Sequence, residues 1–232
     1  MNEEVCYKII SLDEIGSTND YAKSLLEKEE NVFVLAKRQT GGRGTKGRSF
    51  VSETGGVYVS RLTFYENFSV KNAFFIMAGV ATAVCETLRA YGVTPCVKWP
   101  NDIHVNGKKI CGILIENLFS GQNIRSSIVG IGLNVENNLP QELQKIATTL
   151  CAHAPTAKAE EVRTRLIQNL RKEYPIEKYF SYLGYMGAQA EILANGKKIP
   201  AKLLRVEKDG RLAVQTADGI EKFSAAEISL RV

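Results

Sequence analysis

The sequence predicts an α+β fold in two parts, a larger first part that mixes strands with helices and a small C-terminal part built from strands. Three observations carry this prediction. Runs rich in β-branched and aromatic residues at 5–10, 31–36 and 56–64 are typical of strands. Residues 70–90 are apolar nearly all round and indicate a long buried helix. From residue 187 onward, short strand-like runs alternate with turn dipeptides.

Local signals mark the segments of the first part. Ser17-Thr18-Asn19-Asp20 resembles a capping box, and an apolar stripe of helical spacing follows it, so a helix begins here. After the long helix, strand-like runs span 96–99, 109–116 and 127–135. Asn106-Gly107 predicts a hairpin turn that joins a strand at 103–105 to the next one. Residues 157–183 have helical spacing, with a break or restart at Pro175.

The C-terminal part is recognised by its turns. Three turn dipeptides, Asn195-Gly196, Asp209-Gly210 and Asp218-Gly219, separate short strand-like runs. Such a meander fits a small barrel of about 45 residues. A length of 232 residues suits one large domain with a small appendage. We therefore expect domains at 1–184 and 185–232.

Composition excludes several classes of protein. Hydrophobic residues make up 44% and charged residues 24%, which rules out collagenous and disordered chains. The apolar run 73–85 is too short for a membrane span, and the acidic start Met1-Asn2-Glu3-Glu4 does not resemble a signal peptide. Five cysteines without a Cys-x-x-Cys pair and two distant histidines fit neither a disulfide framework nor a zinc site. We expect a soluble, reduced, cytoplasmic protein whose net charge of +5 favours an anionic substrate or partner.

The glycine-rich segment 41–49 is the most unusual stretch of the chain. Gly42-x-Gly44-x-x-Gly47 matches a dinucleotide-binding pattern, but a strand follows it where that motif requires a helix. A P-loop would have lysine at position 48, where this chain has arginine, and the downstream motifs of protein kinases are absent from the sequence. Glycine backbone amides with Arg43, Lys46 and Arg48 can still bind an anion. The alternative is a solvated hairpin loop without a role.

Two further segments are ambiguous when taken singly. Lys98-Trp99-Pro100-Asn101-Asp102 ends a strand and can expose a carboxylate, and Lys109 opens the next apolar strand, where its ammonium can meet a carboxylate or phosphate. The alternatives are strand-end packing and a surface lysine. The segment 130–134, Gly-Ile-Gly-Leu-Asn, permits close approach of either a ligand or a neighbouring strand.

Taken together and in order, these motifs resemble those of biotin protein ligases, the biotin–acetyl-CoA-carboxylase ligases. The motifs are Ser-Thr-Asn at 17–19, Gln39 with Gly42-Arg43-Gly44, Lys98 to Asp102, Lys109 with Gly112 to Glu116, and Gly130 to Asn134. The resemblance covers essentially the whole chain. It implies a mixed β-sheet flanked by helices, as in class II synthetases and lipoate–biotin ligases, followed by an SH3-like β-barrel. It also implies a cytoplasmic enzyme that forms biotinyl-5′-adenylate from biotin and ATP with Mg²⁺, then transfers biotin to a lysine of a biotin carboxyl carrier domain.

Matching motif positions assign roles to individual residues. The resemblance implies that the biotin-binding residues are Ser17, Thr18, Asn19, Gln39, Arg43, Gly44, Thr45 and Lys109. It implies that the nucleotide is contacted by Arg48, Trp99, Asn101, Gly112, Ile113 and Asn134. The catalytic residues would be Lys109, Arg43 and Asp102, with Asp102 also the implied ligand of Mg²⁺.

The sequence departs from the family pattern at two points. Regulatory members carry an N-terminal helix-turn-helix domain, whereas only about four residues precede the first strand here, so we expect no specific DNA binding. The loop commonly has a second arginine where this chain has Thr45. A homodimer is a further expectation from the family.

Two other functions remain open at this stage. A lipoate ligase or octanoyl transferase would share the architecture and the carrier lysine. A different class is an RNA-binding protein that uses the basic loop and the small barrel, although no stretch interleaves several aromatic residues with basic ones.

Overall fold

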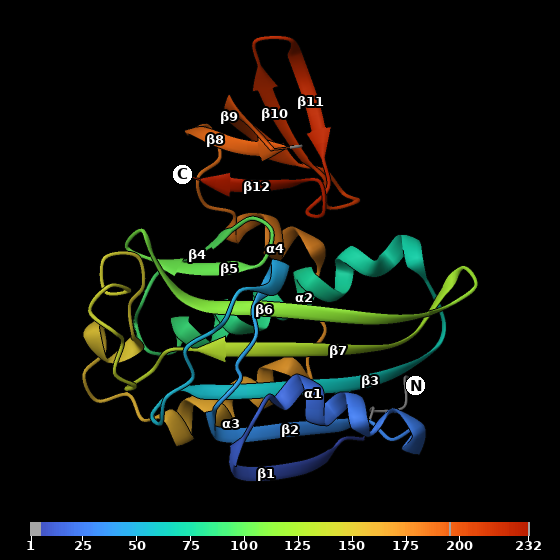
Figure 1. Cartoon of the computed structure of the whole chain (residues 1–232), viewed down its shortest axis with the longest axis vertical. Coiled ribbons are helices and arrows are strands. Elements are labelled where there is room, and N and C mark those ends of the chain that lie inside the picture. The colour runs from blue at the N-terminus through green and yellow to red at the C-terminus, as the bar shows by residue number, and fades with distance from the viewer. Residues whose placement is uncertain (1–5, 195, 232) are drawn as a thin grey trace.

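The computed structural model describes residues 6–194 and 196–231. Its first part contains a seven-stranded sheet with helices on both faces (Figure 1). In chain order the elements are β1 (Lys8–Ile15), α1 (Thr18–Ser24), β2 (Val32–Gln39), β3 (Val57–Ser69), α2 (Ala73–Arg89), β4 (Pro95–Lys98), β5 (Asp102–Val105), β6 (Lys108–Ser120), β7 (Asn123–Leu133), α3 (Ala159–Leu170) and α4 (Ile176–Tyr182). The predicted α+β class is confirmed.

The sheet is mixed, as expected, with the strand order β1-β2-β3-β7-β6-β5-β4. β1 and β2 pair in parallel because the helix α1 carries the chain back across the sheet between them. All other neighbouring strands pair antiparallel. At the predicted hairpin, Asn106 and Gly107 both have positive φ angles (49° and 76°), which a two-residue turn of this kind requires.

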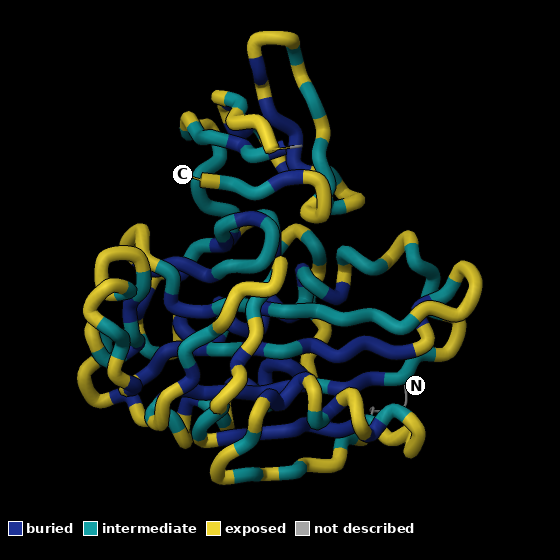
Figure 2. The backbone as a smooth tube through the Cα atoms, viewed as in Figure 1, coloured by how far each residue is buried: buried dark blue, intermediate teal, exposed yellow. Residues whose placement is uncertain are grey.

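Alternating side chains of the strands build two hydrophobic layers. Val32 and Val34 of β2 face α1, where they pack with Ala22 and Leu25. Phe33 and Leu35 face the opposite side, which α2 and α3 cover. The central strands are therefore buried on both faces, and Figure 2 shows them in dark blue.

The helices begin where the sequence predicts. Ser17 is the N-cap of α1, and its hydroxyl accepts a hydrogen bond from the backbone amide of Asp20 at 3.4 Å. By length and composition alone, Val70–Arg89 could cross a membrane, but half of that window is buried inside the protein. Its apolar residues pack in the core against the sheet, as expected of a buried helix.

The first strand differs from the prediction. It spans Lys8–Ile15 instead of 5–10, and Val5 lies outside the described residues. The prediction stopped too early because Asp13 and Glu14 look unsuitable for a strand. β1 is an edge strand, however, and both carboxylates form ion pairs with the neighbouring strand β2: Asp13 with Lys37 at 2.8 Å and Glu14 with Arg38 at 2.5 Å.

The C-terminal part is an antiparallel five-stranded sheet with the order β11-β10-β9-β8-β12. Its strands are β8 (Gln189–Ala194), β9 (Lys197–Val206), β10 (Leu212–Thr216), β11 (Gly219–Phe223) and β12 (Ile228–Arg231). The sheet is open, which is compatible with the predicted SH3-like domain. Asn195, in the first predicted turn, lies outside the described residues. Independent domains at 1–184 and 185–232 stay a prediction.

One residue of the first part joins the two sheets. Trp99 follows β4 and is only 2% exposed, because it packs into the core of the C-terminal sheet with Leu203 and Leu212. Its indole N–H donates a hydrogen bond to the backbone carbonyl of Gly210 at 3.0 Å. The C-terminal sheet is thereby fixed above the β4–β5 end of the large sheet (Figure 1).

Candidate active site

Most of the predicted site residues line one cavity of about 840 Å³ on the α1 side of the large sheet. The N-terminus of α1, the end of β2, the glycine-rich segment, β5, β6 and β7 contribute the walls. The predicted residues that line the cavity are Ser17, Thr18, Asn19, Gln39, Arg43, Gly44, Thr45, Arg48, Asn101, Asp102, Lys109, Gly112, Ile113 and Asn134. Residues as far apart in sequence as Ser17 and Asn134 therefore meet at a single site.

One end of the cavity is polar and uncharged. The side-chain carbonyl of Gln39 accepts hydrogen bonds from the backbone amide of Thr18 at 2.8 Å and from its hydroxyl at 3.0 Å. The amide nitrogen of Gln39 donates to the Ser52 hydroxyl at 2.9 Å. Ser60 Oγ lies 2.8 Å from Thr18 Oγ1 and 2.6 Å from Asn19 Oδ1. These bonds fix the orientation of each group before any ligand arrives.

Two glycines of β7 form the floor of the cavity. A Cβ atom on Gly130 would overlap the Asn19 side chain, and one on Gly132 would overlap the ring of Phe50. The absence of a side chain at these positions lets Asn19 and Phe50 approach the backbone of the strand closely. The glycines therefore serve the packing of neighbouring side chains and leave a flat surface.

Arg43 bonds the glycine-rich segment to α1 and β6, whereas Arg48 bonds within the segment. The Arg43 guanidinium forms ion pairs with Asp20 at 2.6 Å and with Glu116 at 3.0 Å. Arg48 donates to the backbone carbonyl and the hydroxyl of Thr45 at 3.2 and 2.9 Å.

Lys46 has a φ of 57°, which is unusual for a residue other than glycine. Its ammonium donates to the carbonyl of Ile228 at 2.8 Å and to the hydroxyl of Ser229 at 2.9 Å, both in β12. The segment is thus tied both to the large sheet and to the C-terminal sheet.

The other end of the cavity carries an excess of positive charge. Lys109 forms an ion pair with Asp102 at 2.7 Å, and Lys98 and Arg48 add further positive charge at this end. Burial lowers the pKa of Lys98, the Asp102 carboxylate raises it, and the charges of Lys109 and Arg48 lower it further. Burial and the neighbouring Lys98 likewise lower the pKa of His104 to about 4, so this histidine is neutral at pH 7. An anion in this end would relieve the repulsion among the cations.

Trp99 requires a correction. The prediction places it at the nucleotide, but its side chain is buried under the C-terminal sheet and does not line the cavity. A single tryptophan beside a predicted binding motif gives no local sign of packing against a distant sheet.

Several residues around the cavity escape prediction from the sequence. The segment 139–147 supplies Leu139, Leu143 and Ile146, and the side chain of Ile146 is 64% exposed. This apolar part of the wall becomes visible only in the structure, because nothing in the local sequence marks 139–147 as part of the cavity. Additional polar residues that either line the cavity or bond to residues that do include Ser49, Ser52, Ser60, His104, Glu116, Glu142, Lys145 and Arg231.

The donor set for a metal ion is small. Within residues 6–194 and 196–231, no group of three or more His, Cys, Asp or Glu side chains is placed to hold a metal. Asp102 is a single carboxylate that already pairs with Lys109. It fits a Mg²⁺ ion only if phosphate oxygens and water supply most of the ligands, which is common for this metal.

Comparison with known proteins identifies the family. The sequence profile of the biotin/lipoate A/B protein ligase family matches residues 12–134, more than half of the chain. The chain belongs to this family. The chain is 32% identical to the bifunctional ligase/repressor BirA of Bacillus subtilis. The match covers 96% of this chain and 74% of the Bacillus protein. The chain is 30% identical to the biotin–[acetyl-CoA-carboxylase] ligase of Paracoccus denitrificans over 45% of each chain.

Solved structures agree with the sequence relatives. The biotin protein ligase of Aquifex aeolicus, solved in complex with biotin and ATP, is 32% identical to this ligase and superposes with a TM-score of 0.76. The match covers 97% of this chain and 98% of that one. The Paracoccus and Aquifex proteins are biotin ligases by name, so the lipoate alternative is not favoured.

Proposed function

We propose that this chain is an ATP-dependent biotin protein ligase, which forms biotinyl-5′-adenylate and transfers biotin to a lysine of a biotin carboxyl carrier domain. The observation that carries the proposal is the two-ended cavity. An uncharged hydrogen-bonding end suits the ureido ring of biotin, and a cationic end suits the phosphates of ATP. The name of the Paracoccus relative supports acetyl-CoA carboxylase as the source of the carrier.

Biotin would bind at the uncharged end. Ser17, Thr18, Asn19 and Gln39 offer hydroxyl and amide groups to the ring, with their orientation fixed by the hydrogen bonds among them. The carboxylate of biotin would then point toward Arg43 and Lys109, with Gly44 and Thr45 of the loop covering it.

Adenylation would take place between the two ends. A carboxylate oxygen of biotin attacks the α-phosphorus of ATP, the bond to the bridging oxygen breaks, and pyrophosphate leaves. Two anions must meet, so Lys109 and Arg43 stabilise the crowded charge. Asp102 orients the Lys109 ammonium through the 2.7 Å ion pair. Arg48, Asn101, Gly112, Ile113 and Asn134 surround the nucleotide, and Mg²⁺ held by Asp102 and the phosphates would supply further neutralising charge.

Transfer would follow when the carrier lysine enters the cavity. Its neutral amine attacks the acyl carbon, the bond to the phosphate oxygen breaks, and AMP leaves. Asp102, whose residue lines this end of the cavity, would take the proton lost by the amine. Location in the cytoplasm, a homodimer and the absence of specific DNA binding stay predictions.

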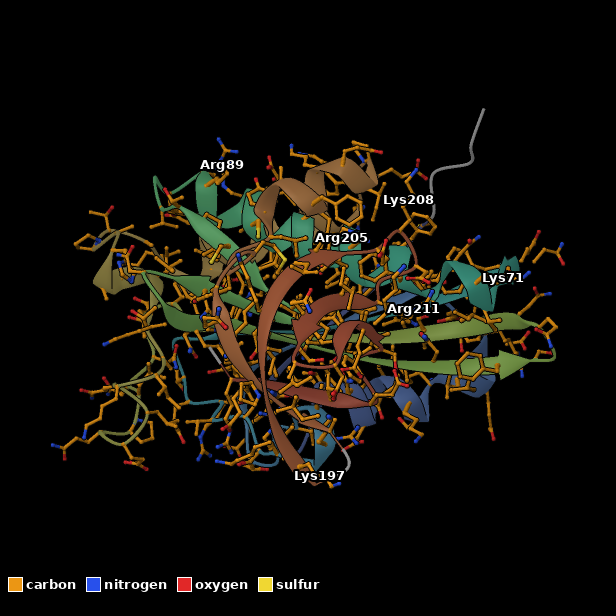
Figure 3. All side chains as sticks on the ribbon, turned by 90° about the horizontal axis from the view of Figure 1, so that it is seen from above. Lys71, Arg89, Lys197, Arg205, Lys208 and Arg211 are labelled. Atoms are coloured by element: carbon orange, nitrogen blue, oxygen red, sulfur yellow. The ribbon has the colours of Figure 1, made fainter. Side chains whose placement is uncertain are left out.

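An RNA-binding function is not favoured by the distribution of charge. The labelled basic side chains in Figure 3 are spread over the face that bears the C-terminal sheet, and they do not form one stripe. Arg205 and Arg211 also pair with Glu207 and Asp209 at 3.0 and 2.8 Å. Backbone-tracking RNA binders require a continuous basic groove.

A ligand-binding experiment tests the choice of vitamin. Melting temperature should rise with micromolar biotin and rise further with biotin plus ATP, because ligands that bind only the folded state stabilise it. Lipoate or octanoate should leave the melting temperature unchanged. A shift with lipoate but none with biotin would contradict the proposal.

A further inference from the structure

Glu116 contacts two predicted biotin-binding residues without lining the cavity itself. It lies on β6, and its carboxylate accepts a hydrogen bond from the Asn19 amide nitrogen at 2.8 Å. The same oxygen lies 3.0 Å from the Arg43 guanidinium. Asn19 is 97 residues away in the sequence and Arg43 is 73 residues away, and both line the cavity. One carboxylate therefore joins the uncharged end of the cavity to the glycine-rich loop.

The orientation of Asn19 depends on this contact. Asn19 is only 4% exposed, and its carbonyl oxygen lies 2.6 Å from the Ser60 hydroxyl. Its amide nitrogen can only donate, so it must face an acceptor, and the Glu116 carboxylate is that acceptor. A buried amide without a partner is costly and would turn or shift to find another one.

Arg43 has two carboxylate partners that differ in their surroundings. The Asp20 side chain is 56% exposed, so water and salt screen its attraction for Arg43 strongly. The Glu116 side chain is 28% exposed, so its pair with Arg43 is screened less. Glu116 should therefore be the stronger of the two contacts that place the guanidinium at the cavity.

We propose that Glu116 is a positioning residue for biotin, because its carboxylate holds the Asn19 amide and the Arg43 guanidinium at the same time. This inference rests on the proposed function of the cavity. Without Glu116, the glycine-rich segment would have to become ordered and the Asn19 amide would have to turn when biotin binds. Both changes cost free energy and weaken the affinity for biotin. The residue acts through its two neighbours and does not touch the ligand.

Three substitutions separate the two contacts. Glu116→Gln keeps an oxygen that accepts from Asn19 but loses the charge that holds Arg43, so biotin should bind about 5–20-fold more weakly. Glu116→Ala loses both contacts, and the loss should reach about 30–100-fold. Asp20→Asn is the matched control, because it removes the exposed partner of Arg43 alone and should change affinity by less than about threefold.

The experiment is titration calorimetry with biotin, without ATP, on the full chain. Melting temperatures of all variants are measured in parallel, so that affinity is compared only among folded proteins. A double-mutant cycle combines Glu116→Gln with Arg43→Ala. If Glu116 acts through Arg43, Glu116→Gln should weaken binding by less than about twofold in the Arg43→Ala background. A purely structural role would give the same loss in both backgrounds.

The outcomes distinguish this inference from the proposed function. If the wild type binds biotin and Glu116→Gln binds it equally well or more tightly, the inference is overturned and the proposed function stands. The inference is also overturned if Glu116→Gln weakens biotin binding equally in the wild-type and Arg43→Ala backgrounds. A wild-type chain that binds no biotin would overturn the proposed function, and the inference with it.

Discussion

Removing the Lys109 ammonium should stop adenylation while leaving the fold intact. Lys109 is the cation that pairs with Asp102 at 2.7 Å, and it belongs to none of the hydrophobic clusters of the described residues, so Lys109→Ala leaves the core packing intact. In the reaction, its charge offsets the repulsion between the carboxylate of biotin and the α-phosphate. One such group contributes about 3–4 kcal/mol to the transition state, so the rate should fall by about 10²–10³.

The unpaired Asp102 adds to this effect. Once Lys109 is gone, the Asp102 carboxylate faces the incoming anions without its partner and repels them. The assay is biotin-dependent release of pyrophosphate without carrier, which reports the first step alone. Lys71→Ala replaces an exposed lysine that does not line the cavity; it is the control and should behave as wild type. A Lys109→Ala rate within about threefold of wild type would refute the electrostatic reasoning.

Four further predictions concern the loop, stability and partners. Thr45→Arg should slow biotinyl-adenylate release severalfold in a stopped-flow chase, because Lys46 is engaged with β12 and Thr45 offers one neutral hydroxyl; equal release rates would exclude a role for this position. Trp99→Ala should cost about 3–5 kcal/mol of unfolding free energy by denaturant titration, since it leaves a cavity between the sheets. Burial raises the pKa of the Glu86 carboxyl, but hydrogen bonds from Tyr182 and Lys178 lower it overall. The ionised carboxylate should therefore stabilise the folded protein above about pH 4.3, and this stabilisation should be lost as the pH falls through the lowered pKa. The free energy of unfolding of Glu86→Gln should accordingly fall less with acid than that of the wild type. Sequence-specific operator DNA should not bind at physiological salt in mobility-shift assays with biotin and ATP.

Local signals in the sequence predict much of the fold. The cap at Ser17 and the turn at Asn106-Gly107 are correct because both depend on residues within four positions of each other. The early end predicted for the first strand is wrong because the partners of Asp13 and Glu14 come from β2. The strand propensities of single residues do not include ion pairs to a neighbouring strand, which form only once the sheet edge is assembled.

In the candidate site, too, local motifs are predicted from the sequence and contacts between distant segments are not. Motif order brings most lining residues together correctly, since each motif sits at the end of a strand or helix that faces the cavity. Glu116 is missed as a site residue because its contacts to Asn19 and Arg43 require the helix α1, the strand β6 and the glycine-rich segment to be in place. Trp99 is misassigned because its packing partners come from the C-terminal sheet. Contacts over such separations in sequence depend on the folded topology.

Transfer of biotin to a carrier lysine at the expense of ATP can be measured on the carrier itself. The measurement is the intact mass of a purified biotin carboxyl carrier domain after incubation with the enzyme, biotin, ATP and Mg²⁺. The mass should increase by one biotinyl group, the increase should require ATP, and it should be lost when the acceptor lysine is replaced by arginine, because arginine stays protonated and cannot attack. An unmodified carrier under these conditions, with an enzyme shown to be folded, would show that this chain does not catalyse the transfer.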